Sequence, residues 1–144
     1  MVLIHVSLVP DGAKVIFLFG EIDCRESFLV SVEKCRYENV VEAASVAIDI
    51  YIQALVELQK TRKFQIFVHP VNSVLNETRV VVRLFNEILA RKLKQFPALH
   101  LLDFADRLLT DDKEALKKEY ELDGTHLNPS YLPLVESALQ TVWK

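Results

Sequence analysis

Val15-Ile16-Phe17-Leu18-Phe19-Gly20 is the stretch that decides the fold of this 144-residue chain. It follows the turn signal Pro10-Asp11-Gly12 and is an unbroken apolar run of strand length, as expected for a strand that is buried on both faces. Strands of that kind belong to parallel sheets, whose two faces are both covered by helices. The stretch therefore predicts an α/β protein.

The rest of the chain alternates helical and strand patterns. Apolar residues recur at three- and four-residue intervals from Val40 onward, with Asn39 as the expected N-cap, and again over residues 76–95. Short apolar runs at 64–68 and 98–103 predict two more strands, and 111–120 predicts a short surface helix or an ordered loop. Asn128 followed by Pro129 predicts the start of a last helix. We expect one domain over 1–144, a three-layer α/β/α fold with a parallel flavodoxin-like sheet.

Composition excludes several classes of function. The formal net charge is -3 and no basic cluster is present, so we expect no nucleic-acid partner. No apolar stretch has the length of a membrane span or the pattern of a signal peptide, so we expect a soluble, cytoplasmic protein. Cys24 and Cys35 do not form a disulfide framework, and the four histidines have no metal-ligand spacing. We therefore expect neither a metal nor a cofactor.

Ligands of parallel sheets bind at the carboxyl ends of the strands. Three segments are predicted there: residues 20–25, residues 69–72 and the loop that leads to His126. In that loop, Asp123 precedes His126 by three residues, just before the start of a helix. A carboxylate so placed can orient a histidine that acts as a general base. His69 either faces the same cleft or has a purely structural role.

Two blocks of sequence, Phe19-Gly20-Glu21-Ile22-Asp23-Cys24-Arg25 and Asp123-Gly124-Thr125-His126-Leu127-Asn128-Pro129, together resemble SGNH (GDSL-type) hydrolases. The order of the elements is similar to that family as well. The resemblance implies that His126 is the general base and Asp123 its orienting carboxylate. It also implies an oxyanion and substrate loop that contains Gly20, Glu21, Asp23 and Arg25, with Gly20 and Asp23 at the ends of the family's Gly-x-Asn-Asp block.

The sequence departs from that family in two ways. Ile22 stands where the family has an asparagine that donates to the oxyanion, and losing one such donor costs about 100- to 1,000-fold in rate. The family's Gly-Asp-Ser block has no counterpart, because every serine of the chain lies in another context. We therefore expect that the usual first third of the domain is absent and that ester hydrolysis by this chain is absent or weak.

A domain without its first strands would leave an open sheet edge at residues 15–19. We expect either that residues 1–8 cover this edge as a strand or that two copies form a homodimer there.

Three functions remain open at this stage. The first is that of an SGNH-like relative that would cleave a small-molecule ester if an upstream serine were supplied. The alternative is a non-catalytic module that binds a small polar ligand or a protein through Glu21 to Arg25. A third reading is a cysteine enzyme that uses Cys24 with His126.

Overall fold

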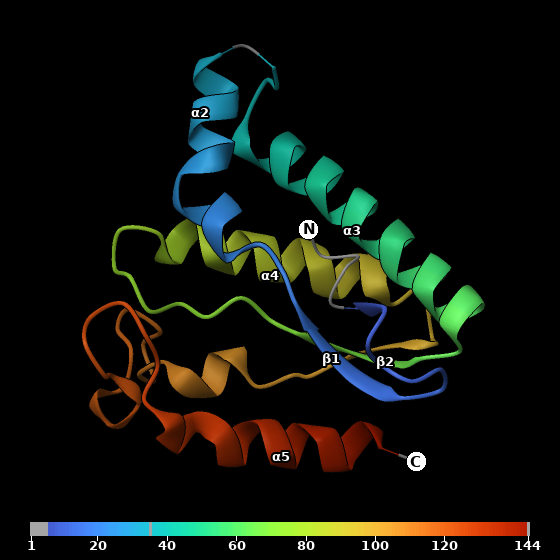
Figure 1. Cartoon of the computed structure of the whole chain (residues 1–144). Coiled ribbons are helices and arrows are strands. Elements are labelled where there is room, and N and C mark those ends of the chain that lie inside the picture. Colours follow the sequence, from blue (N-terminus) through green and yellow to red (C-terminus); the bar gives the residue numbers. More distant parts are fainter. Residues whose placement is uncertain (1–5, 35, 144) are drawn as a thin grey trace.

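The computed structural model describes residues 6–34 and 36–143 and shows an α/β chain (Figure 1). Its three strands are β1 (Lys14–Leu18), β2 (Gln65–His69) and β3 (Leu99–Leu101). The longer helices are α2 (Phe28–Glu33), α3 (Val40–Arg62), α4 (Arg79–Leu93) and α5 (Leu132–Val142). Shorter helical turns are η1 (Asp23–Ser27), η2 (Ala105–Leu108), η3 (Lys118–Tyr120) and η4 (Pro129–Tyr131). The strands and the three helices predicted from apolar spacing are thus present.

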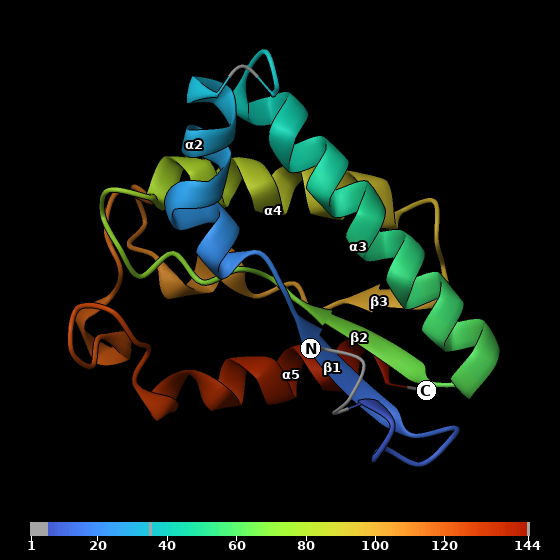
Figure 2. The same ribbon diagram turned by 45° about the horizontal axis from the view of Figure 1, so that its top comes forward.

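The sheet is parallel, as predicted, with the strand order β1-β2-β3. β1 pairs with β2 over five residues, and β2 pairs with β3 over three, with Ile66 opposite Leu99. Helices lie on both sides of it: α3 and α4 on one side and α5 on the other (Figures 1 and 2). This arrangement brings the carboxyl ends of the three strands to one rim.

The core is divided between the two faces of the sheet. Ile66 and Val68 point from β2 into a cluster shared with α3 and α4. Phe67, which lies between them in sequence, packs instead with residues of α5 such as Leu134 and Val135. This alternation is expected for a central strand that is covered on both faces.

β1 corrects the prediction of a strand buried on both faces, because one of its faces is partly buried and the other is exposed. Val15 and Phe17 pack against the cluster under α3 and α4. On the other face Ile16 is 43% exposed and Leu18 is 51% exposed. α5 packs on β2 and on the segment that follows β3. On the β1 half of this face, the Lys14 ammonium lies over the ring of Trp143, just after α5, at 3.3 Å from the ring centroid. Among residues 6–34 and 36–143, β1 pairs with β2 alone.

The start of the chain also differs in part from the prediction of a covering strand. Residues 6–9 form a turn closed by the Val9 amide on the Val6 carbonyl at 3.1 Å. The guanidinium of Arg62, at the end of α3, donates to the carbonyl oxygens of Val6 (3.3 Å) and Val9 (2.6 Å). This turn cannot extend the sheet, so the prediction is wrong for residues 6–8, while residues 1–5 lie outside the described part.

Helix starts confirm two capping predictions. The Asn39 side chain accepts a hydrogen bond from the Glu42 amide at 3.0 Å, as an N-cap of α3 should. Asn128 accepts from the Ser130 amide and caps η4, a short 3-10 turn that leads into α5. Residues 111–120 form an ordered loop that ends in η3. No helix of the described segments combines the length and apolar character needed to cross a bilayer.

Candidate functional site

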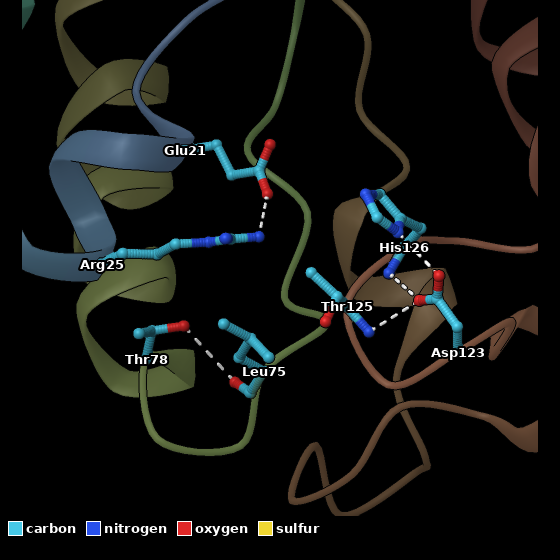
Figure 3. Close-up of polar contacts among 7 residues, drawn as sticks. All are labelled: Glu21, Arg25, Leu75, Thr78, Asp123, Thr125 and His126. Carbon is cyan, nitrogen blue, oxygen red and sulfur yellow. Dashed lines mark hydrogen bonds and ion pairs between the residues drawn. The ribbon is translucent and has the colours of Figure 1, made fainter.

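The two blocks singled out in the sequence lie at the same end of the molecule. Residues 20–25 directly follow β1, and the loop with Asp123 and His126 leads into η4 and α5. Glu21 and Arg25 lie on one side of the segment that bears Leu75, and His126 and Asp123 lie on its other side (Figure 3). No hydrogen bond or ion pair among the described residues joins the two groups directly.

Asp123 and His126 form a closed local unit. The Asp123 Oδ2 atom lies 2.8 Å from Nδ1 of His126, while Oδ1 accepts from the backbone amides of Thr125 (2.9 Å) and His126 (2.8 Å). The hydrogen bond from the His126 ring, followed by those from the two amides, lowers the pKa of Asp123 to about 2. The carboxyl group is therefore ionised at neutral pH and holds the ring in one orientation.

The surrounding turn keeps this pair in place. Gly124 has φ +80°, a left-handed conformation that glycine adopts readily, and it lets the chain fold back over Asp123. The Leu122 amide donates to the His126 carbonyl at 3.3 Å, and the Asn128 amide donates to the Tyr120 carbonyl at 2.8 Å. The His126 side chain is nevertheless 69% exposed, so the ring remains accessible.

Gly20 is required by the structure of the strand end. Its φ is +106°, and a Cβ atom added to it would lie 2.6 Å from Cζ of Phe85 on α4. Its carbonyl accepts from the Cys24 amide at 2.9 Å, which starts a helical segment. Glu21 to Arg25 are consequently helical, so the conformation predicted for this segment, a loop, is wrong, while its role at an oxyanion or substrate stays a prediction.

The helical segment from Glu21 to Arg25 carries three charged side chains. Glu21 Oε1 and an Arg25 guanidinium nitrogen lie 2.6 Å apart, an exposed pair four residues apart that contributes little to stability. Asp23 makes no side-chain hydrogen bond within the described residues. Ile22 is 74% exposed, so the residue that the resemblance to SGNH hydrolases would place at the amide-donor position is a hydrocarbon side chain open to solvent.

The environment of Cys24 does not suit a cysteine enzyme that uses this thiol with His126. Its side chain is 1% exposed, and burial, followed by the nearby charges of Asp23 and Glu21, raises its pKa to about 12. Such a thiol is protonated at neutral pH and inaccessible to a substrate. The structure argues against a thiolate nucleophile here.

His69 is separate from the pair at His126. It is 6% exposed, its Nδ1 atom lies 2.6 Å from the Pro70 carbonyl, and its ring packs edge-on against Phe104 and Tyr131. Burial lowers its pKa, which keeps the ring neutral. The structural role is the one that this environment supports.

Sequence reasoning missed the polar contacts that hold the neighbouring loop. The Asn86 amide group on α4 both donates to the Val71 carbonyl and accepts from the Val71 amide, each at 2.9 Å. The only available signal was an amide side chain at a helical position next to the buried Phe85 and two residues before the buried Ile88. Arg79, also buried, ties the same loop to the Glu114 carbonyl.

Within residues 6–34 and 36–143, no serine, threonine or tyrosine hydroxyl is hydrogen-bonded to the His126 ring. The nearest serine in sequence, Ser130, donates its hydroxyl to the Glu119 carbonyl at 2.5 Å. The described residues contain no group of three or more histidine, cysteine, aspartate or glutamate side chains that could hold a metal ion.

No family model, curated protein or solved structure matches this chain.

Proposed function

We propose that this chain is a relative of the SGNH (GDSL-type) ester hydrolases, on a flavodoxin-like sheet, that retains the base half of a hydrolytic site. In this proposal His126 removes a proton from the attacking hydroxyl and Asp123 fixes the ring and stabilises its charged form. A serine supplied by a segment upstream of this sequence would be the nucleophile. By itself the chain would hydrolyse a small ester weakly or not at all.

The observation that carries the proposal is the 2.8 Å contact between Asp123 Oδ2 and His126 Nδ1 on an exposed ring. With Nδ1 donating to the carboxylate, Nε2 carries the lone pair that a general base needs. The turn supports this arrangement before any substrate binds, because both backbone amides that hold Asp123 belong to the same loop.

A second candidate function is a module that binds a small polar ligand or a protein partner without catalysis. It is favoured by the exposed Ile22 where an oxyanion donor is needed, and by the absence of a serine contact to His126 within the described residues. The Glu21–Arg25 pair would then supply polar contacts on the face turned toward His126 (Figure 3).

The first test of the proposal measures the tautomer of His126 by nitrogen-15 NMR at neutral pH. We expect a proton on Nδ1 and a bare Nε2. Asp123→Asn should shift the population toward protonated Nε2, because the remaining oxygen keeps the two backbone amides and the NH2 group that replaces Oδ2 donates to Nδ1. Asp111→Asn, an exposed aspartate outside this turn, is the matched control and should leave the tautomer unchanged. A wild-type ring protonated mainly on Nε2 would count against the base role.

Activity gives the second test, with p-nitrophenyl acetate as substrate. Any rate above buffer should fall about 100-fold in His126→Ala, the lower end of the contribution of a positioned base. A rate that the substitution leaves unchanged would discount His126 as the base.

The coding sequence upstream of Met1 separates the two candidate functions. An in-frame Gly-Asp-Ser after a strand would favour the hydrolase, and a genuine start at Met1 would favour the binding module.

A further inference from the structure

We infer that the pocket between α4 and the segment after β3 binds a small zwitterion of the amino-acid type. The pocket has a volume of about 190 Å³ and opens at the carboxyl ends of β2 and β3, where parallel sheets bind ligands. Its polar lining consists mainly of Ser73, Arg83, Glu87, Asp103, Asp106 and Lys113. None of these residues belongs to the Asp123–His126 pair, so this inference does not depend on the proposed function.

The pocket brings unpaired charges of both signs together. Arg83 and Glu87 lie on neighbouring turns of α4, and Asp103 follows β3 on the opposite wall. Within the described chain none of these three side chains makes a hydrogen bond or an ion pair. Lys113 and Asp106, by contrast, neutralise each other in a salt bridge at the same pocket. One cation and two solvent-exposed carboxylates, none of them in an ion pair with a described residue, therefore line the same pocket.

Ser73 adds a buried polar group without a partner. It is only 5% exposed, it lines the pocket, and its hydroxyl bonds to no described residue. The hydroxyl keeps some contact with the solvent of the pocket, so a polar ligand there would replace water as its hydrogen-bond partner. This is a second observation, besides the charges, that points to a ligand.

The walls are held by contacts that do not involve the free charges. Asn86 bonds to both backbone groups of Val71 and fixes the loop before Ser73 against α4. Arg79 donates to the Asn76 side chain at 2.7 Å and to the Glu114 carbonyl at 2.6 Å, which joins that loop to the one bearing Lys113. A pocket whose walls are already ordered binds a ligand at a lower entropic cost.

Size and charge together define the ligand class. A volume of about 190 Å³ is several times that of one water molecule and lies below the range of about 300 to 1,000 Å³ typical of drug-sized ligands. Arg83 presents a planar fork that suits a carboxylate, and Glu87 and Asp103 suit an ammonium group. A molecule with both groups a few atoms apart satisfies the two walls at once.

The test is titration of the full-length protein with the twenty standard amino acids, followed by NMR of the backbone amides. At least one should shift the amides of Ser73, Arg83 and Asp103 with a Kd of about 1 mM or tighter. Acetate and methylammonium, which each carry half of the charge pair, should bind at least about 10-fold more weakly, because a half ligand gives up about 1.4 kcal/mol or more.

Substitutions of pocket residues test whether the amino acid binds in this pocket. Arg83→Gln and Asp103→Asn should each weaken binding about 10-fold, the expected loss of one charged contact. Arg91→Gln and Asp111→Asn, exposed positions outside the pocket, are the matched controls and should bind as the wild type does. The inference is overturned if no amino acid shifts these amides at about 10 mM, well above the expected Kd, if acetate binds as tightly as any zwitterion, or if Arg83→Gln binds normally while its circular dichroism is native.

Discussion

At the scale of single residues, Gly20 shows how one position can serve the backbone and the core together. Its positive φ allows the chain to leave β1 and enter a helix, and its missing Cβ makes room for the ring of Phe85. The resemblance to SGNH hydrolases offered a functional reading of this glycine. The packing gives it a structural reason that holds whether or not the chain is an enzyme.

Gly20→Ala should therefore destabilise the protein by about 3 kcal/mol, the sum of backbone strain and a forced shift of Phe85. Gly12→Ala is the matched control, because Gly12 also has a positive φ (+78°) but an added Cβ would meet nothing within 4 Å. We expect about 1 kcal/mol for the control, from backbone strain alone. Urea unfolding measures both, and equal losses in the two variants would refute the close approach to Phe85.

His69 should make the stability of the fold depend on pH just below neutrality. Burial lowers its pKa in the folded state, while the unfolded chain binds a proton near the ordinary value of about 6.5. Unfolding thus takes up a proton, and the free energy of unfolding should decrease as the pH falls from about 7.5 to about 5.5. Above that window both states are neutral and the effect vanishes.

Replacing His69 by phenylalanine, which can still pack against Phe104, should flatten this pH dependence. His100→Phe is the control, because His100 also packs beside an aromatic ring, that of Phe67, but is only partly buried. Chemical unfolding at the two pH values gives the slopes. If His69→Phe keeps the wild-type slope, the buried ring is not its source.

At the scale of elements, the long helices were predictable and the short ones were not. α3 has an N-cap, Asn39, and a long apolar stripe, so its start and type follow from local chemistry. The helical segment from Glu21 to Glu33 has neither signal. Phe28 is buried but the adjacent apolar residues Leu29 and Val30 are exposed, so the apolar residues do not recur at helical spacing. The contacts of this segment with α3 and α4 stabilise it instead.

At the scale of the whole molecule, β1 combines exposed apolar side chains with an outer edge that no described strand pairs. Ile16 and Leu18 are exposed there, and the outer edge of β1 is free of hydrogen bonds to the described residues. Exposed apolar strand edges promote association. Self-pairing of two antiparallel β1 strands about Ile16 would set Lys14 opposite Leu18, so it brings no like charges together.

We therefore expect the wild-type chain to associate as its concentration rises, through β1. Ile16→Lys should keep it monomeric, because a charged side chain on the strand opposes close pairing. Val80→Lys is the control, since Val80 is 78% exposed on α4, far from β1 in sequence, and that variant should associate as the wild type does. Sedimentation velocity distinguishes the species. A wild type that remains monomeric at every concentration would rule out this interface.

The pattern of residues along the chain determined the local chemistry of this protein. Apolar runs and capping side chains predicted three parallel strands, α3, α4 and α5, because these signals act between residues close in sequence. The Asp123–His126 contact belongs to the same class, since both partners lie in one turn.

Only the tertiary structure decided which surfaces are covered and which charges meet. It left Ile16 and Leu18 bare, buried Cys24, and assembled the pocket around Ser73 and Arg83 from segments far apart in the chain. The physical reason is that burial and charge pairing depend on which neighbours the packing of helices on the sheet brings close. These spatial neighbours cannot be inferred from the few residues on either side of a position in the sequence.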